Sequence, residues 1–193
     1  MIAEKLPDFG LDTSGRLGSH FRALGADDFR TAARYVRDLP YGRNSDRSAF
    51  SLVLTEGRGT CSTKHALLAA LAREHDADVE LRLGVYLMDG ANTPGVADVL
   101  DAHGLAGLPE AHCYLAYRDE RVDVTGAGAN AVQRLLREEA IEPEQIGAYK
   151  VDMHRDFVRT WAAGRGLDPE RAWTAREECI GALSGRGVPQ NGG

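Results

Sequence analysis

The chain has 193 residues, of which 43% are hydrophobic and 27% are charged, which suits one globular domain with its own core. Its formal net charge of −6, with Lys and Arg scattered along the chain, argues against nucleic acid or an anionic membrane as the main partner. The longest apolar runs, such as residues 66–72, are too short to cross a bilayer, and the first residues lack the pattern of a secretory signal.

The three cysteines cannot all pair, and their spacing suits no disulfide framework. A reducing cytoplasm is therefore the expected location, and a free reactive thiol is compatible with it. We expect an irregular N-terminal arm over residues 1–26, one α+β domain over residues 27–183 and a flexible, Gly-rich tail over residues 184–193.

Within that domain, the spacing of apolar residues predicts helices and strands in alternation. In chain order these are a helix over 29–38 that Pro40 ends, a helix from Cys61 to near His75, a strand over 79–88, a short helix over 95–103, a hairpin of strands 112–117 and 121–124, a helix over 131–140, a strand over 149–153, and helices over 154–163 and 168–183.

Cys61 stands at the start of the second predicted helix, directly after the Gly-rich turn Gly57-Arg-Gly59. A free cysteine is most often a small buried hydrophobic residue. Here, however, the unpaired N–H groups and the dipole of a helix N-terminus favour a thiolate, and small polar side chains flank the thiol. This position therefore indicates a candidate nucleophile.

His112 and Asp123 lie on the two strands of the predicted hairpin. The tight connection makes these strands neighbours, so the imidazole and the carboxylate lie side by side under most registers. An imidazole can take the proton of a thiol, and a carboxylate can fix its tautomer and offset its charge. Together with Cys61, these residues form a candidate Cys-His-Asp triad.

Three blocks of sequence carry a resemblance to a known family: Gly59-Thr-Cys61-Ser-Thr-Lys-His65-Ala-Leu-Leu, His112-Cys-Tyr114, and Val122-Asp123-Val-Thr125. In order and spacing they resemble the transglutaminase-like superfamily of papain-type cysteine enzymes, over about residues 35–126. The resemblance implies Cys61 as nucleophile, His112 as base and Asp123 as orienting carboxylate. It also implies a nucleophile helix packed on a small antiparallel sheet, here with additional C-terminal helices.

The resemblance further implies a place for the oxyanion that forms during acyl transfer. Tyr114 falls at the family's aromatic position after the histidine, and Tyr41 and Asn44 lie where a second oxyanion donor is expected upstream of the cysteine. The backbone N–H of Cys61 is the first donor. The implied activity is acyl transfer, or hydrolysis of a peptide, protein or small amide substrate, through a thioester and without a cofactor.

Two other interpretations stay open at the level of sequence. The domain can be an interaction module that keeps the fold without turnover, because one fold hosts many roles. Alternatively, Cys61 and His65, four residues apart on one helix, can form a zinc site with His112 or Cys113. Cys113 itself is predicted to be structural.

Overall fold

The computed structural model describes residues 2–125 and 134–185. Its helices are η1 (Ile2–Lys5), α1 (Arg16–Ala23), α2 (Phe29–Asp38), α3 (Leu52–Glu56), α4 (Cys61–Glu74), α5 (Ala97–Ala102), η3 (Pro143–Ile146), α6 (Ala148–Ala163) and α7 (Pro169–Gly185). Its strands are β1 (Glu80–Met88), β2 (Leu108–Tyr117), β3 (Glu120–Val122) and β4 (Leu135–Ile141). The fold class is therefore α+β, as predicted.

The strands form one antiparallel sheet in the order β3-β2-β1-β4. Gly84 of β1 lies opposite His112 of β2 on one side and Glu138 of β4 on the other. A methyl group at Gly84 would lie 2.8 Å from the side chain of Leu135 and 3.1 Å from the ring of Tyr114. Because Gly84 has no side chain, the side chains of Leu135 and Tyr114 can pack directly over this part of β1.

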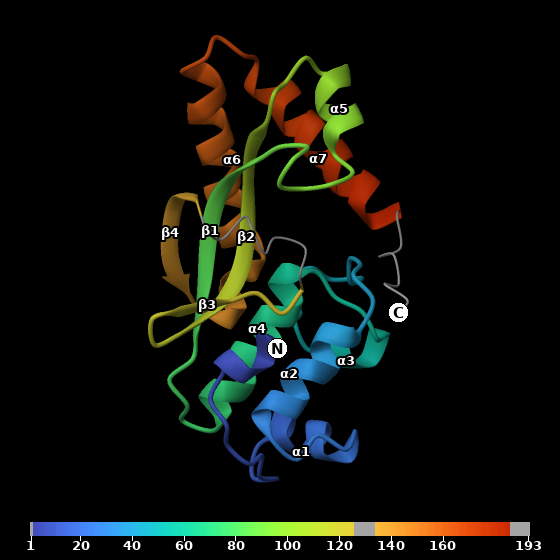
Figure 1. Cartoon of the computed structure of the whole chain (residues 1–193), viewed down its shortest axis with the longest axis vertical. Coiled ribbons are helices and arrows are strands. Elements are labelled where there is room, and N and C mark those ends of the chain that lie inside the picture. The colour runs from blue at the N-terminus through green and yellow to red at the C-terminus, as the bar shows by residue number, and fades with distance from the viewer. Residues whose placement is uncertain (1, 126–133, 186–193) are drawn as a thin grey trace.

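Helix α4 runs through the main hydrophobic core. Its residues from Cys61 to Ala72 are all buried, and its Leu and Ala side chains pack with α2 and with the central strands. Figure 1 shows α1 to α4 gathered at one end of the molecule, α5 and α7 at the other, and the sheet between them. A second cluster joins the far ends of β1 and β2 to α5 and α7.

The N-terminal segment is more ordered than predicted. Residues 1–26 were expected to be irregular, yet they contain η1 and α1, and Leu6, Leu11 and Phe21 are buried in the main core. The carboxylate of Glu74, at the end of α4, accepts hydrogen bonds from the backbone N–H groups of Leu17 and Gly18 (3.0 and 2.7 Å). This cap satisfies the first turn of α1 from a distant part of the chain.

Two predicted elements near residue 140 are wrong. The predicted helix over 131–140 is strand β4 from Leu135 onward, and residues 131–133 lie outside the described part of the chain. Pairing with β1 overrides the helical propensity of its Leu, Arg and Glu residues. The predicted strand over 149–153 belongs to α6, in which Lys150, His154 and Val158 continue one helical spacing.

The other elements agree with the prediction to within a few residues. Strand β2 begins earlier than expected, at Leu108, and α7 ends at Gly185 rather than near residue 183. The remaining residues of the predicted tail, 186–193, lie outside the described part. Within residues 2–125 and 134–185, no helix has the length and apolar character that a membrane span requires.

Candidate active site

Helix α4 begins at Cys61 because two glycines in the preceding turn and the N-cap residue Thr60 fix where the helix starts. Gly57 has a left-handed backbone (φ +62°), and a methyl group at Gly59 would come within 2.9 Å of Thr63 Oγ1 and of Val53. Thr60 is the N-cap, and its backbone N–H donates to Thr63 Oγ1 (3.0 Å). The thiol is therefore held at the first position of the helix, 7% exposed.

His112 and Asp123 meet at the end of the hairpin, as predicted. The distance from His112 Nε2 to Asp123 Oδ2 is 2.9 Å, and both residues are buried. The other carboxylate oxygen of Asp123 accepts hydrogen bonds from the backbone N–H and the hydroxyl of Thr125 (2.8 and 2.6 Å). These bonds fix the carboxylate, which in turn holds the imidazole ring.

The thiol of Cys61 interacts with the imidazole of His112, so the three predicted residues form one chain of interactions. Burial alone would raise the pKa of Cys61, but the positive charge of His112, then that of Lys150, lowers it to about 6. Burial would lower the pKa of His112, yet the charges of Cys61 and Asp123 raise it well above its usual value. Near pH 7 the site therefore favours a thiolate and an imidazolium.

Asp123 stays ionised in this arrangement. Its burial would raise its pKa, but the adjacent His112 and the hydrogen bonds that it accepts hold the pKa well below the usual value. A carboxylate that keeps its charge beside a histidine stabilises the imidazolium form.

His65 lies next to His112 as a neutral side chain whose two ring nitrogens both have hydrogen-bond partners. Its Nδ1 lies 2.8 Å from the carbonyl oxygen of Cys61, and its Nε2 accepts a hydrogen bond from the backbone N–H of Val124 (3.0 Å). Burial lowers its pKa to about 4. Because both ring nitrogens are engaged, His65 is a poor metal ligand, and no three His, Cys, Asp or Glu side chains converge as a metal site in the described residues.

The three predicted oxyanion and aromatic residues have different surroundings. Tyr41 is positioned by a backbone bridge to Gly59, and its hydroxyl group interacts with both the thiol and the backbone of Cys61. Burial and the nearby Cys61 raise the pKa of Tyr41 well above its usual value, so the hydroxyl keeps its proton. Tyr41 thus keeps a protonated hydroxyl group in contact with Cys61.

Asn44 and Tyr114 are engaged elsewhere. The amide nitrogen of Asn44 donates to Glu56 and to the carbonyl oxygen of Arg58, and its oxygen accepts from Thr63 Oγ1 (2.8 Å). Asn44 therefore braces the start of α4 and has no amide hydrogen left for a substrate. The hydroxyl of Tyr114 donates to Glu138 of β4, across the sheet.

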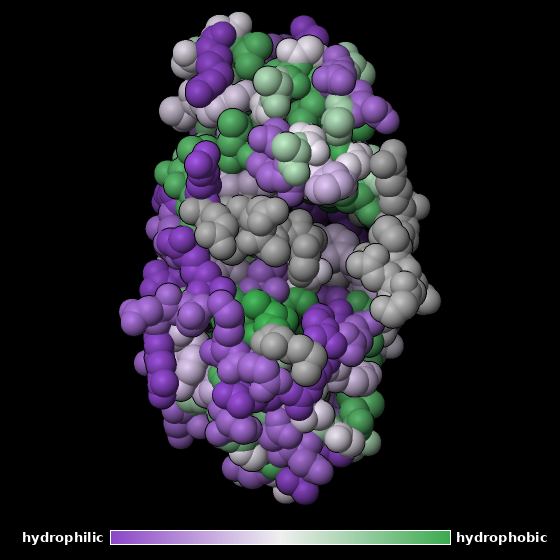
Figure 2. Space-filling model, viewed as in Figure 1, coloured by the Kyte–Doolittle hydropathy of each residue, from purple (hydrophilic) through white to green (hydrophobic). Residues whose placement is uncertain are grey.

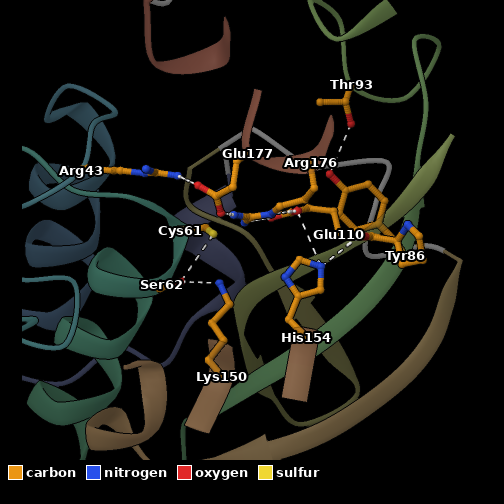
Figure 3. A network of polar contacts seen from close by, with 11 residues as sticks. Arg43, Cys61, Ser62, Tyr86, Thr93, Glu110, Lys150, His154, Arg176 and Glu177 are labelled. Carbon is orange, nitrogen blue, oxygen red and sulfur yellow. Dashed lines mark hydrogen bonds and ion pairs between the residues drawn. The ribbon is translucent and has the colours of Figure 1, made fainter. Parts of the chain in front are cut away.

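A cavity of about 90 Å³ lies next to Cys61. Its wall includes the start of α4, the loop after α2, and one side of α6 and α7. In Figure 3, Lys150 reaches from α6 toward Ser62, and its ammonium group donates to the Ser62 hydroxyl (2.6 Å). In the space-filling view, a hollow separates the two ends of the molecule at mid-height (Figure 2).

An ion-pair network, buried at Glu110 and Arg176 and more exposed at Glu177 and Arg43, closes one side of the cavity (Figure 3). Arg176 of α7 binds Glu110 of β2 through two hydrogen bonds of 2.7 Å and also donates to Glu177 (2.6 Å), which accepts from Arg43 (3.1 Å). Arg176 holds the pKa of Glu110 at about 2, against the effect of burial. The network ties α7 and the loop after α2 to the strand that carries His112.

Sequence reasoning missed Lys150, Glu110 and Arg176. Lys150 lay in a predicted strand, and the two partners of the buried pair are 66 residues apart, so no local pattern pointed to them. One signal was present in the sequence: the chain has only three lysines, and two of them contact α4 or belong to it, Lys64 within α4 and Lys150 from α6.

The other two cysteines differ from Cys61. All three are free and buried. Burial raises the pKa of Cys113, and it raises that of Cys179 to about 11. Only Cys61 has a pKa that favours the thiolate near neutrality.

The comparisons with known proteins add no relative: no protein-family model, no curated protein and no solved structure matches this chain.

Proposed function

We propose that this chain is a cysteine-dependent acyltransferase or amide hydrolase of the transglutaminase-like, papain-type kind, with Cys61 as nucleophile. The observation that carries the proposal is the position of His112, which interacts with the thiol of Cys61 and with the carboxylate of Asp123 at once. The packing of helix α4, which carries the nucleophile, on a small antiparallel sheet is compatible with a papain-type fold. Three unpaired thiols favour a reducing, cytoplasmic setting.

The proposed reaction begins with attack of the Cys61 thiolate on an amide carbonyl carbon, which forms a C–S bond and a tetrahedral oxyanion. Because Nε2 of His112 faces Asp123, Nδ1 is the nitrogen that faces the sulfur. The imidazolium gives its Nδ1 proton to the leaving amine as the C–N bond breaks. A water molecule or a second amine then loses a proton to His112 and attacks the thioester, and cleavage of the C–S bond releases the acyl product and restores the Cys61 thiolate beside the imidazolium.

Two groups are placed to stabilise the oxyanion. The first is the backbone N–H of Cys61 at the start of α4, where the helix dipole favours negative charge. The second is the hydroxyl group of Tyr41, which interacts with the thiol and keeps its proton. Asn44 drops out of this role because its amide hydrogens are bonded to Glu56 and Arg58, whereas the Tyr41 hydroxyl group is bonded at Cys61 itself.

The alternative of a silent interaction module is less well supported. A buried thiolate, imidazolium and carboxylate cost desolvation energy, which an inactive scaffold has no reason to keep. The zinc alternative fails on geometry, since His65 has both ring nitrogens occupied.

The test measures the rate of carbamidomethylation by iodoacetamide between pH 5 and 9, with peptide mapping of the labelled cysteine. Because a lowered pKa means that the thiolate persists down to that pH, labelling of Cys61 should be half-maximal near pH 6. His112→Ala should move the midpoint toward the usual thiol pKa of about 8.5. Cys113 and Cys179 are internal controls and should react slowly below pH 9.

Turnover is tested with a panel of peptides and small amides, with hydroxylamine added to trap acyl transfer as a hydroxamate. Cys61→Ala is the blank, and Cys179→Ala is the matched control for loss of a buried thiol. Equal labelling of the three cysteines, or a midpoint that His112→Ala leaves unchanged, would contradict the proposed mechanism. A reactive Cys61 without any turnover would favour the interaction module.

A further inference from the structure

The cavity beside Cys61 is lined by more positive than negative side chains. Among the described residues, its lining contains the cations Arg43, Arg47, Lys150 and Arg176, but only one acidic residue, Glu110. This contrasts with the whole chain, whose formal net charge is −6. A local charge opposite in sign to that of the protein indicates selection for an anionic ligand.

Two of the four cations are neutralised within the protein. Nε and Nη2 of Arg176 donate to the two carboxylate oxygens of Glu110, and Arg43 shares Glu177 with Nη1 of Arg176. The two arginines and the two glutamates therefore balance. Glu110 in particular is engaged with Arg176, so it does not repel an anion that enters the cavity.

Within the described residues, the other two cations, Lys150 and Arg47, form no ion pair with a carboxylate, although Lys150 lies within the electrostatic reach of Cys61 and Glu110. The ammonium group of Lys150 donates to the neutral hydroxyl of Ser62, one residue after the nucleophile. Arg47, in the loop between α2 and α3, is exposed, and it makes no hydrogen bond or ion pair within residues 2–125 and 134–185. One cation thus lies beside the thiol, and the other lines the same cavity.

We infer that the substrate carries a carboxylate on the part that enters this cavity, near the scissile carbonyl, and that Lys150 and Arg47 bind it. The inference rests on the proposed function, since it takes Cys61 as the nucleophile. Apolar side chains of Ile146, Val151 and Trp173 also line the cavity, so the carboxylate can be carried on an aliphatic group. A peptide with an acidic side chain, or with a free C-terminal carboxylate, has this chemistry.

The charges of the triad do not cancel this attraction. The thiolate of Cys61 and the imidazolium of His112 are neutral as a pair. Asp123 lies on the other side of the imidazole, bonded to His112 and Thr125, and it is not part of the cavity wall. With Lys150 and Arg47 both charged, the site keeps a net positive charge where the substrate enters.

The test compares two alkylating agents that react at the same carbon and differ in charge, iodoacetate and iodoacetamide. Dividing their rates at Cys61 cancels any change in the amount of thiolate, because both reagents attack through the same sulfur. The ratio should fall about three- to tenfold in Lys150→Met, as expected for loss of one charge within several Å, and less in Arg47→Gln. Lys150→Arg should keep the ratio.

Arg16→Gln is the matched control, because Arg16 is also an exposed arginine but lies on α1 and is not part of the cavity wall. Arg47 is exposed, so Arg47→Gln remains informative even if Lys150→Met does not fold. A ratio that is the same in wild type, Lys150→Met and Arg47→Gln would overturn the inference. Failure of both reagents to label Cys61 would instead overturn the proposed function.

Substrate pairs then distinguish the two sources of the carboxylate. Peptides with Glu or Gln beside the scissile bond test a side-chain carboxylate, and peptides with a free or an amidated C-terminus test a terminal one. We expect one pair to differ at least tenfold in kcat/KM in the wild type and to differ less in Lys150→Met. Equal rates within both pairs would contradict the inference.

Discussion

His112 has two ring nitrogens, and each of them has a partner in the site. Nε2 lies 2.9 Å from Asp123, which leaves Nδ1 for Cys61. His65 has a different role, because its nitrogens bind the carbonyl oxygen of Cys61 and the N–H of Val124 and its burial keeps it neutral. The site thus contains one histidine placed for proton transfer and one that joins α4 to the Asp123 loop.

At this scale the second oxyanion donor can be tested. Tyr41→Phe removes the hydroxyl next to Cys61 and leaves the ring in place. We expect kcat for amide turnover to fall about 10²-fold, the usual effect of losing one oxyanion donor. The alkylation of Cys61 should change little, since it forms no oxyanion. A parallel loss of both rates would mean that Tyr41 acts on the thiol instead.

Among the elements, α4 carries the site because its start is fixed from several directions. Asn44 binds Thr63, and the ammonium group of Lys64 donates to the carbonyl oxygens of Arg37 and Leu39 at the end of α2. These bonds set the position of the following Tyr41 relative to Cys61. Burial lowers the pKa of Lys64 to about 8. Its ammonium group donates to carbonyl oxygens at the end of α2, where a helix leaves its last carbonyl groups without a partner inside the helix.

The turn before α4 gives a prediction about stability. In Gly59→Ala, the added methyl group would lie 2.9 Å from Thr63 Oγ1 and from Val53, so the turn must move. We expect a loss of about 1 to 3 kcal/mol in the free energy of unfolding, measured with urea, together with slower alkylation of Cys61.

Gly181→Ala is the control for this change. Gly181 lies within α7, and a methyl group there meets no atom within 4 Å. It should therefore stabilise the protein by about 0.5 to 1 kcal/mol, because alanine favours the helix. If both substitutions had the same effect, the close approach at Gly59 would not be the cause.

For the whole molecule, the pair of Glu110 and Arg176 connects the sheet to α7 in the wall of the cavity. The side chains of both residues are about one-tenth exposed. Removing one partner of a buried pair leaves the other charge without compensation. We therefore expect loss of either residue of this pair to weaken the packing of α7 on β2 and to lower the free energy of unfolding.

Glu110→Gln should lower the free energy of unfolding at pH 7 by about 3 to 5 kcal/mol. Asp156→Asn, in the exposed pair with Arg159 on α6, should cost less than about 1 kcal/mol. Because the pKa of Glu110 is lowered to about 2, its stabilisation is complete above its unfolded pKa and is lost as the pH falls toward 2. The difference in free energy of unfolding between wild type and Glu110→Gln should therefore shrink on acidification. A difference that stays the same at all pH values would contradict the stabilising role of ionised Glu110.

Much of the fold was predictable from local patterns. The helix that starts at Cys61 and the hairpin that joins His112 to Asp123 depend on residues close in sequence, and both are as predicted. Strand β4 and the first turn of α6 were predicted in the wrong class. There, pairing with β1 and packing against the core decide between helix and strand, and neither is visible in a short window.

The sequence by itself determined the candidate nucleophile, its base and its carboxylate, because a helix start and a hairpin each place their residues by short-range geometry. Only the tertiary structure decided that the start of α4 meets the middle of β2, and that Lys150 and Arg176 from the last two helices enter the same site. Those residues are brought together by packing of a shared core, which depends on all the elements at once and leaves no mark in the local spacing.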